Sequence, residues 1–355
     1  MKKVLIAGCG GAPSEGVVNS LLLCNKGDEI IGMGSEPADL IMSNAKKKFL
    51  IPYAIEDNYE TELIKILHAE NPDLVHFQND IEIFKASIIR DEILKTGTKL
   101  FMPPHETIDV CVNKYKSYLK WKKSGIKVPE NIYINSEDDL KLAFSELSDK
   151  NGNIWLRSAS ISGGGKGALP TNDYNFAKGW IDRYKGWGEF IAAKLLSPDS
   201  VTWLSIWHEG ELIVAQTRKR IGWIHGNRTL SGITGVTKVG QTMSDNKITE
   251  IAIDSIKCID SKPHGIFGVD LTLDFDGYPN PTEINISRFF TTILFFTKAG
   301  LNMPKIYKDI ILHNEFPKLK SKINPLPNNL YWLRAMDSEP MLKSDNDFKN
   351  KIIKL

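Results

Sequence analysis

The chain has 355 residues, of which 42% are hydrophobic and 25% are charged, and its formal net charge is +2. This composition is typical of a folded protein with two or three packed domains, and it excludes the disordered, collagen-like and disulfide-scaffold classes. The near-neutral charge argues against a nucleic-acid partner. The local lysine cluster at Lys120, Lys122 and Lys123 is therefore interpreted as a solvated helix face.

The cysteines and the apolar runs indicate the compartment. Four cysteines are widely spaced and form neither a metal-binding nor a disulfide pattern, so we expect free thiols in a reducing compartment: Cys9, Cys24, Cys111 and Cys258. No apolar run approaches the roughly 18 residues of a membrane span, and the N-terminal run is too short for a signal peptide. We expect a cytoplasmic protein without a membrane partner.

The first third of the chain alternates between strand and helix patterns. Apolar runs bounded by glycine, proline or polar residues predict strands at 3–8, 29–34, 73–78 and 98–104, and helices from Ser14, at 58–72 and at 81–94. This alternation predicts a parallel, doubly wound, Rossmann-like domain over residues 1–106. Its ligand crevice is expected at the carboxyl ends of the strands, near 8–11, 78–80 and 103–105.

The pattern changes after residue 106. A helix capped by Thr107 or Asp109 and ending at Gly125 precedes a strand at 126–134, and a small α+β unit is expected over 107–188. That unit also contains a helix at 136–147, a strand at 153–158 and a helix at 174–184. Residues 189–355 have longer, hairpin-connected strands, a helix near 245–259 and a terminal strand at 330–342, and form the third expected unit.

A glycine cluster follows the first strand. The sequence GCGGAPSEG begins at Gly8 and resembles a dinucleotide fingerprint, but Pro13 stands where the third glycine is required. Because this third glycine is missing, a dehydrogenase that binds NAD here is disfavoured. A tight turn and a small-molecule carboxylate pocket remain as alternatives.

A second glycine cluster lies in the stretch WLRSASISGGGKGALP, residues 155–170. It is not a Walker A loop, because Ser160 and Gly167 occupy the positions of its first glycine and its hydroxyl residue. Flanking strand patterns indicate a hairpin tip. Bare backbone at Gly163, Gly164 and Gly165 could approach phosphate oxygens, with charge from Lys166 and Arg157. The alternative is a mobile loop with incidental cations.

A third motif lies at residues 268–289. Asp276-Gly277 predicts a two-residue hairpin turn, and the resulting register places Asp270 opposite Glu283, with Asn285 on the same face. Two facing carboxylates repel each other unless a cation lies between them. Mg²⁺ prefers such oxygen ligands and leaves positions for water and phosphate, so a magnesium site is predicted, with Mn²⁺ as an alternative metal.

Together these motifs resemble the ATP-grasp superfamily, in particular its carbamoyl-phosphate-synthase-like carboxylate–amine ligases. The resemblance covers nearly the whole chain and depends on VNKYKSY, RSASISGGGKG and EINISR in that order. It implies a Rossmann-like domain followed by a two-lobed ATP-grasp fold. The implied site residues are Lys114 and Arg157 on the nucleotide phosphates, Gly163–Gly167 with Lys166 over the β- and γ-phosphates, Lys194–Leu196 on adenine, Asp270, Glu283 and Asn285 on the metal, and Arg288 beside the transferred phosphoryl group.

The sequence departs from the family at two places. Lys194 stands where a glutamate is common, and Ile286-Ser287 lengthen the spacing between Asn285 and Arg288 by one residue. The implied cofactors are ATP and Mg²⁺. The implied catalytic residues are Arg288 and Lys166.

The implied reaction joins a small-molecule carboxylate to an amine through an acyl phosphate, and a homodimer is an allowed assembly. Between the adenine strand and the metal hairpin, a carboxylate pocket could be lined by Arg218, Lys219, Arg220, Arg228, His225 and 231–235. These cations could equally be a solvated strand end, and His225 could be structural. The rival function is a catalytically degenerate ATP-binding scaffold.

Overall fold

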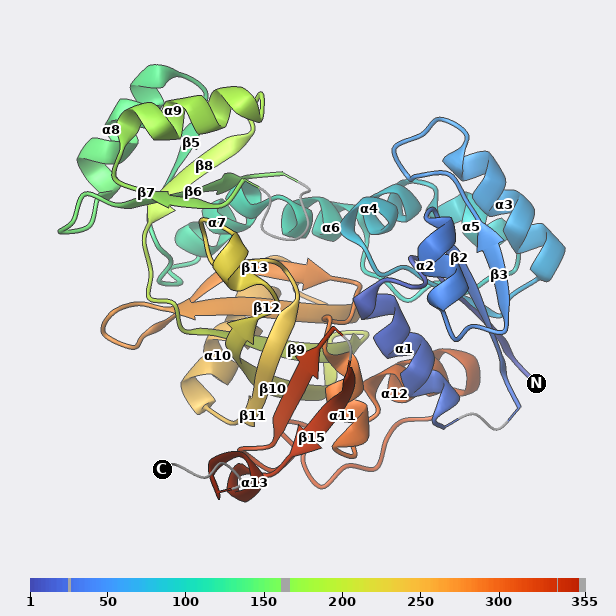
Figure 1. Ribbon diagram of the computed structural model, residues 1–355. Helices are drawn as coiled ribbons and strands as arrows, with labels where there is room; N and C mark the ends of the chain where they lie inside the picture. Colours follow the sequence, from blue (N-terminus) through green and yellow to red (C-terminus); the bar gives the residue numbers. More distant parts are fainter. Residues whose placement is uncertain (25–26, 161–166, 337, 351–355) are drawn as a thin grey trace.

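The computed structural model describes residues 1–24, 27–160, 167–336 and 338–350. Strands in these ranges form three sheets, and each sheet comes from its own stretch of the chain (Figure 1). The expected combination of a parallel α/β sheet with antiparallel α+β sheets is confirmed. No helix in the described ranges is both long and apolar enough to cross a bilayer.

The first sheet is parallel, with the strand order β3-β2-β1-β4. Alternate residues of β1 face opposite sides: Val4 packs toward α1, whereas Leu5 packs toward α3 and α4. Helices therefore cover both faces, as a doubly wound sheet requires. The elements are β1 (Lys3–Ile6), α1 (Ala12–Leu22), β2 (Glu29–Gly34), α2 (Pro37–Met42), β3 (Lys47–Leu50), α3 (Tyr59–Glu70), β4 (Leu74–His76), α4 (Asp80–Ile88) and α5 (Arg90–Lys95).

Several boundaries in this region differ from the predictions. The strand predicted at 98–104 is wrong: Lys99 makes only an isolated parallel bridge to Leu74, and the two prolines at the end of the segment cannot donate to a sheet. The helix predicted at 81–94 is two helices that meet at Ile89. The short α2 and the lysine-rich β3 were not predicted.

The helix predicted after residue 106 is also divided. It consists of α6 (His105–Val112) and α7 (Lys114–Lys123), and neither Thr107 nor Asp109 is a cap. Asn113 between them is extended, and its side chain accepts hydrogen bonds from the backbone N–H groups of Tyr115 and Lys116. This N-cap begins a new helix at Lys114.

The second sheet is antiparallel, with the order β5-β8-β6-β7. It contains β5 (Asn131–Ile134), β6 (Ile154–Ser158), β7 (Leu169–Thr171) and β8 (Phe190–Lys194), and α8 (Glu137–Leu147) and α9 (Tyr174–Arg183) pack against it (Figure 1). The pairing of β6 with β7 confirms that the glycine-rich stretch connects a hairpin. Residues 161–166 of that connection, including Gly163, Gly164, Gly165 and Lys166, lie outside the described residues.

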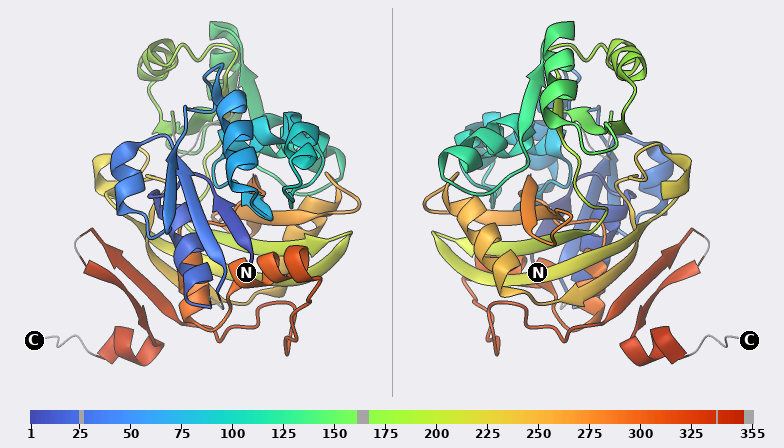
Figure 2. Two further views of the ribbon diagram at one scale, coloured as in Figure 1. Left: turned by 90° about the vertical axis from the view of Figure 1, so that its right-hand side faces the viewer. Right: turned by 90° about the vertical axis from the view of Figure 1, so that its left-hand side faces the viewer.

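The third sheet is antiparallel, with the order β13-β12-β9-β10-β11-β14-β15. Its strands are β9 (Ser200–His208), β10 (Glu211–Trp223), β11 (Thr237–Met243), β12 (Gly265–Leu273), β13 (Pro279–Ile286), β14 (Tyr331–Ala335) and β15 (Ser338–Lys343). Helices α10 (Asn246–Lys257), α11 (Ile293–Lys298), α12 (Met303–His313) and α13 (Asp345–Asn350) complete this part. The terminal strand predicted at 330–342 is a hairpin, β14–β15, which projects from the body (Figure 2).

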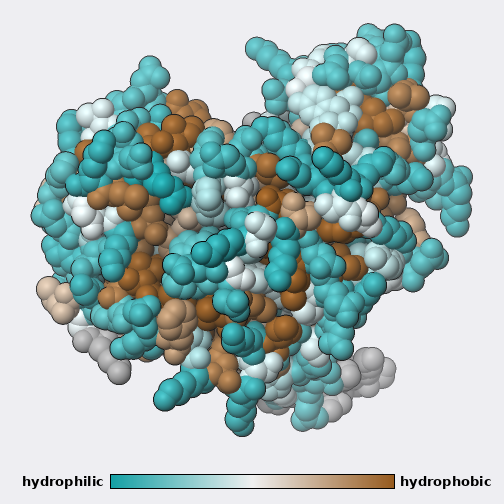
Figure 3. All heavy atoms as spheres, turned by 180° about the vertical axis from the view of Figure 1, so that it is seen from behind, coloured by the Kyte–Doolittle hydropathy of each residue, from teal (hydrophilic) through white to brown (hydrophobic). Residues whose placement is uncertain are grey.

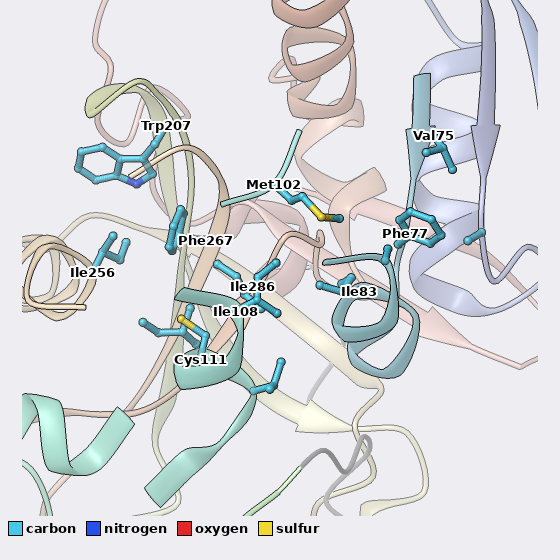
Figure 4. Close-up of a cluster of buried hydrophobic side chains, with 14 of the residues drawn as sticks. Val75, Phe77, Ile83, Met102, Ile108, Cys111, Trp207, Ile256, Phe267 and Ile286 are labelled. Carbon is cyan, nitrogen blue, oxygen red and sulfur yellow. The ribbon is translucent and has the colours of Figure 1, made fainter. Parts of the chain in front are cut away.

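A shared core fixes the first sheet against the third. In Figure 4, Phe77, which follows β4, lies beside Ile83 of α4. Ile83 lies between Phe77 and Ile108 of α6, and Ile108 lies near Ile286 of β13. These side chains are at most 2% exposed. Close packing across this core holds the carboxyl edge of the first sheet beside the β12–β13 hairpin.

The four cysteines are free, as expected.

One glycine of the cluster after β1, Gly10, is required by close packing. Gly10 has φ +89°, and a Cβ at this position would lie 2.0 Å from the carbonyl oxygen of Asp39 in α2. Alanine there combines left-handed backbone strain with a backbone clash, so Gly10→Ala should lower the free energy of unfolding by at least ~2 kcal/mol in urea titrations. Gly179→Ala in α9, where a Cβ meets nothing within 4 Å, should instead stabilise by about 0.5–1 kcal/mol. Equal effects of the two substitutions would contradict this explanation.

Candidate active site

A cavity of about 1120 Å³ lies where parts from all three sheets meet. Seen from behind, a notch separates the α8–α9 lobe from the remainder of the molecule (Figure 3). The cavity is lined by every described residue assigned to the site except Gly167: Lys114, Arg157, Lys194, Leu195, Leu196, Asp270, Glu283, Asn285 and Arg288. Gly167 follows the undescribed segment with φ +74°, and its carbonyl accepts from Trp180 Nε1 at 3.0 Å.

The turn of the β12–β13 hairpin differs from the prediction. It is not a two-residue turn: Asp274 and Tyr278 close a three-residue loop, and Gly277 takes the left-handed position with φ +81°. This shifts the register near the tip by one residue, so Leu271 faces Pro281. A bulge at Thr282 then shifts it back.

The bulge restores the predicted pairing at the site. Asp270 faces Glu283, and Gly268 faces Asn285. Asn285 Nδ2 donates to Asp270 Oδ2 at 3.2 Å, and the Thr202 hydroxyl donates to Asp270 Oδ1. The three oxygen-bearing side chains therefore lie together on one face of the hairpin, as predicted, although the turn that positions them is different.

Two cations from different elements converge on Glu283. Arg157 Nη2 lies 3.2 Å from Glu283 Oε2, and Lys114 Nζ lies 3.8 Å from the same oxygen. A backbone hydrogen bond from Lys114 N to Ala159 O, at 2.8 Å, ties the start of α7 to the chain just beyond β6. Burial opposes ionisation of Glu283, but the charges of Arg157 and Lys114 outweigh it and lower its pKa to about 2. The carboxylate is therefore ionised at neutral pH.

Arg288 reaches the same cluster despite the lengthened spacing. The extra residue, Ser287, has φ +55° and is buried, so the backbone turns sharply between Asn285 and Arg288. Arg288 then donates to Asn285 Oδ1 and pairs with Asp80, with Nε 2.7 Å from Asp80 Oδ1. Burial disfavours the Arg288 charge, but Asp80 outweighs it and raises the pKa.

The donor set fits a hard divalent cation. Asp270 and Glu283 supply carboxylate oxygens, Asn285 supplies an amide oxygen, and the residues lie at a cavity wall where further positions can face water or substrate. Among the described residues no cluster of three or more His, Cys, Asp and Glu side chains is arranged for a metal. The candidate set here is two carboxylates and one amide. The present hydrogen bonds of Asp270 and Asn285 must rearrange for such binding.

The first sheet contributes polar residues that were not assigned individually. Asp80 begins α4 and orients Arg288, while Gln78 Oε1 accepts from the backbone N–H of Phe289 at 2.8 Å. Glu82 lies deeper against Tyr59, and burial raises its pKa to about 7. The predicted crevice pointed to this edge at two of its three places, since Gly8, Cys9 and residues 78–80 line the cavity. Residues 103–105, also predicted, do not line the cavity.

The residues proposed for a carboxylate pocket do not all face the cavity, because successive side chains of β10 point to opposite faces of the sheet. Arg218 and Arg220 share one face and line the cavity with residues 231–235. Lys219 points away and pairs with Asp199 at 2.9 Å. Arg228 and His225 are not among the lining residues, and the His225 ring contacts the Met336 sulfur at 2.9 Å.

The chain has the ATP-grasp fold, as expected from its motifs, and solved structures of that fold match it over nearly its full length. Carboxyaminoimidazole ribonucleotide synthase from Aspergillus clavatus, complexed with ATP, is 16% identical with a TM-score of 0.69, over 94% of this chain and 81% of that one. L-amino acid ligase from Bacillus licheniformis is 11% identical with a TM-score of 0.66, over 94% and 79%.

A third match is the biotin carboxylase domain of 2-oxoglutarate carboxylase from Hydrogenobacter thermophilus, in complex with MgADP and bicarbonate. It is 14% identical with a TM-score of 0.69, over 93% of this chain and 74% of that one. No protein-family model matches the sequence, and no curated protein does either.

Proposed function

We propose that this protein is an ATP- and Mg²⁺-dependent ligase that joins a small-molecule carboxylate to an amine and releases ADP and phosphate. The observation that carries the proposal is the convergence of Asp270, Glu283 and Asn285 on one cavity wall, with Arg157 and Lys114 against Glu283. The synthase complexed with ATP and the carboxylase domain complexed with MgADP support the same cofactors for this fold.

The residues have separate proposed roles in phosphoryl transfer. The carboxylate oxygen of the substrate attacks the γ-phosphorus of ATP, the bond to ADP breaks, and an acyl phosphate forms. Such transfer requires mainly positioning and neutralisation of phosphate charge. Lys114 and Arg157, which contact Glu283, are proposed to hold phosphate oxygens, and Arg288, which is held by Asp80, is proposed to contact the reacting group. Mg²⁺ on Asp270, Glu283 and Asn285 supplies further charge neutralisation when bound.

The second step needs water excluded and the amine admitted. The amine nitrogen attacks the acyl carbon, phosphate leaves, and the amine loses a proton. An acyl phosphate hydrolyses when water reaches it, so the hairpin connection between β6 and β7 is proposed to close over bound nucleotide, with Lys166 on the phosphates. Leu195 and Leu196 line the cavity beyond β8 and are proposed, with Lys194, to contact adenine.

An ADP-release screen tests the proposal. Pairs of candidate carboxylates and amines are added with ATP and Mg²⁺, and ADP and inorganic phosphate are measured together with the amide product. We expect equal amounts of ADP, phosphate and amide with at least one pair, and no ADP without Mg²⁺. ATP binding without turnover by any pair would favour a non-catalytic scaffold, and failure to bind ATP would reject both functions.

A further inference from the structure

One cation in the cavity makes no direct contact with a carboxylate of the described residues. Arg218 is 1% exposed. Within the described part of the chain its guanidinium donates only to hydroxyls: Nη1 to Thr292 at 2.8 Å and to Thr237 at 3.2 Å, and Nη2 to Thr202 at 2.8 Å. Its Nε has no hydrogen-bond partner among the described residues. A guanidinium has five N–H groups, so three hydroxyls leave donors unused. Burying a charge that no carboxylate contacts directly is costly. Burial lowers the pKa of Arg218 well below its usual value, and the charge of Asp270, reached through the Thr202 hydroxyl, opposes this only in part.

The environment of Arg218 holds the side chain in this position. Its Cζ lies 4.5 Å from the centre of the Phe290 ring. Gly240 on the neighbouring strand leaves room for the aliphatic stem, because a Cβ at Gly240 would lie 3.2 Å from Arg218 Cδ. Packing and three hydroxyls therefore fix a buried charge at a cavity wall, which is the arrangement expected of a preorganised anion receptor.

A second arginine on the same strand face extends the positive charge. Arg220 stacks on Trp223, with Cζ 4.1 Å from the ring centre, and Nη2 lies 3.6 Å from Asp270 Oδ1. Asp270 is thus the one carboxylate that this pair approaches within the described residues, and it is also a member of the proposed metal cluster. Metal binding would divert its charge from Arg220.

The two arginines are separated from the cations assigned to the nucleotide. Arg157 and Lys114 contact Glu283, whereas Arg220 approaches Asp270, so the facing carboxylates lie between the two cationic groups. If Lys114 and Arg157 hold the nucleotide phosphates on one side of Asp270 and Glu283, a different anion can bind on the other side, beside Arg218 and Arg220. Residues 231–235 border that side of the cavity.

We propose that Arg218 and Arg220 form a subsite for an oxyanion, carboxylate or phosphate, carried by the substrate that is phosphorylated. The proposal rests on the proposed function for the role of the bound molecule, but the binding of an oxyanion can be tested without nucleotide. It places the substrate's negative charge beside the metal cluster, on the side opposite to Lys114. It also explains why an arginine that no described carboxylate contacts directly is retained in the interior.

The test is calorimetric titration of succinate and, separately, of inorganic phosphate into nucleotide-free protein. Arg218→Met and Arg220→Met should each weaken succinate binding about tenfold or more, because each removes charge-assisted hydrogen bonds. Lys219→Met is the matched control: it removes one positive charge from the same strand but on the opposite face, and should bind like wild type. The melting temperature of Arg218→Met is not expected to fall, because methionine replaces a buried charge without a carboxylate partner.

The outcomes distinguish a carboxylate from a phosphate ligand, and they distinguish failure of the oxyanion subsite from failure of the proposed ligase function. If Arg220→Met weakens the binding of succinate but not of phosphate, the subsite is specific for a carboxylate. If it weakens the binding of both equally, the subsite accepts oxyanions in general. Succinate binding that is the same in wild type and Arg220→Met, or absent from wild type, overturns the subsite even if Arg218→Met does not fold. Loss of both succinate and phosphate binding in Lys114→Met, with neither weakened in Arg220→Met, overturns it as well. ATP binding, measured separately with Mg²⁺, decides the proposed function independently.

Discussion

Replacing Glu283 with glutamine is expected to lower Mg²⁺-dependent ADP release at least about a hundredfold, because charge neutralisation by a bound metal is worth several kcal/mol. The substitution keeps the shape of the side chain but removes the negative charge that faces Arg157 and Lys114. Nucleotide affinity without Mg²⁺ should be retained or increased, since both cations then lack a carboxylate partner and remain available to phosphate. Slower ADP release with Mg²⁺, together with unchanged or higher nucleotide affinity without Mg²⁺, would indicate loss of a metal ligand rather than misfolding of the site.

A matched control is available in the α8–α9 lobe. Glu137 is also paired with a lysine, Lys178, at 2.6 Å, but it is exposed and lies outside the cavity, so Glu137→Gln should leave ADP release unchanged. Acidification to about pH 5 should not reproduce the Glu283→Gln effect, because a carboxyl group with a pKa near 2 remains ionised there. If Glu283→Gln released ADP as fast as the wild type, the proposed metal cluster would have no role in the reaction.

The β12–β13 hairpin shows what a local sequence signal can determine. Asp276-Gly277 correctly indicated a reversal, since Gly277 supplies the left-handed backbone position of the turn. It did not determine the loop length, and the register is correct at Asp270 and Glu283 only because a bulge at Thr282 compensates for the three-residue loop. A bulge depends on interactions across two strands and has no fixed sequence signature.

Other parts of the site depend on contacts between distant segments. The sequence left open whether Arg218 lines a pocket or belongs to a solvated strand end. Its burial could not be predicted, because its three hydroxyl partners come from Thr202, Thr237 and Thr292. Asp80 was placed near the crevice by the rule for parallel sheets, but its pairing with Arg288 joins residues 208 positions apart. Chain order alone contains no signal for either contact.

Arg288→Met is expected to reduce the rate of ADP release by roughly a thousandfold at saturating substrates, with nucleotide affinity changed less than about threefold. Removing one preorganised charge from a transferring group typically costs this much, because it acts where charge develops during the reaction. Arg288 contacts Asn285 and Asp80, whereas Lys114 and Arg157, the cations proposed to bind the nucleotide, contact Glu283. The loss should therefore appear in turnover rather than in binding.

Asp80 provides the means to separate positioning from a structural role. Asp80→Asn keeps the size of the side chain but weakens the ion pair that orients Arg288, and it should lower turnover about tenfold. If Asp80 acts only through Arg288, the double variant should be no slower than Arg288→Met alone, so the two effects should be strongly non-additive. Turnover of the double variant that equals the product of the two separate losses would show that Asp80 contributes by another route, and that the first sheet has its own role in the reaction.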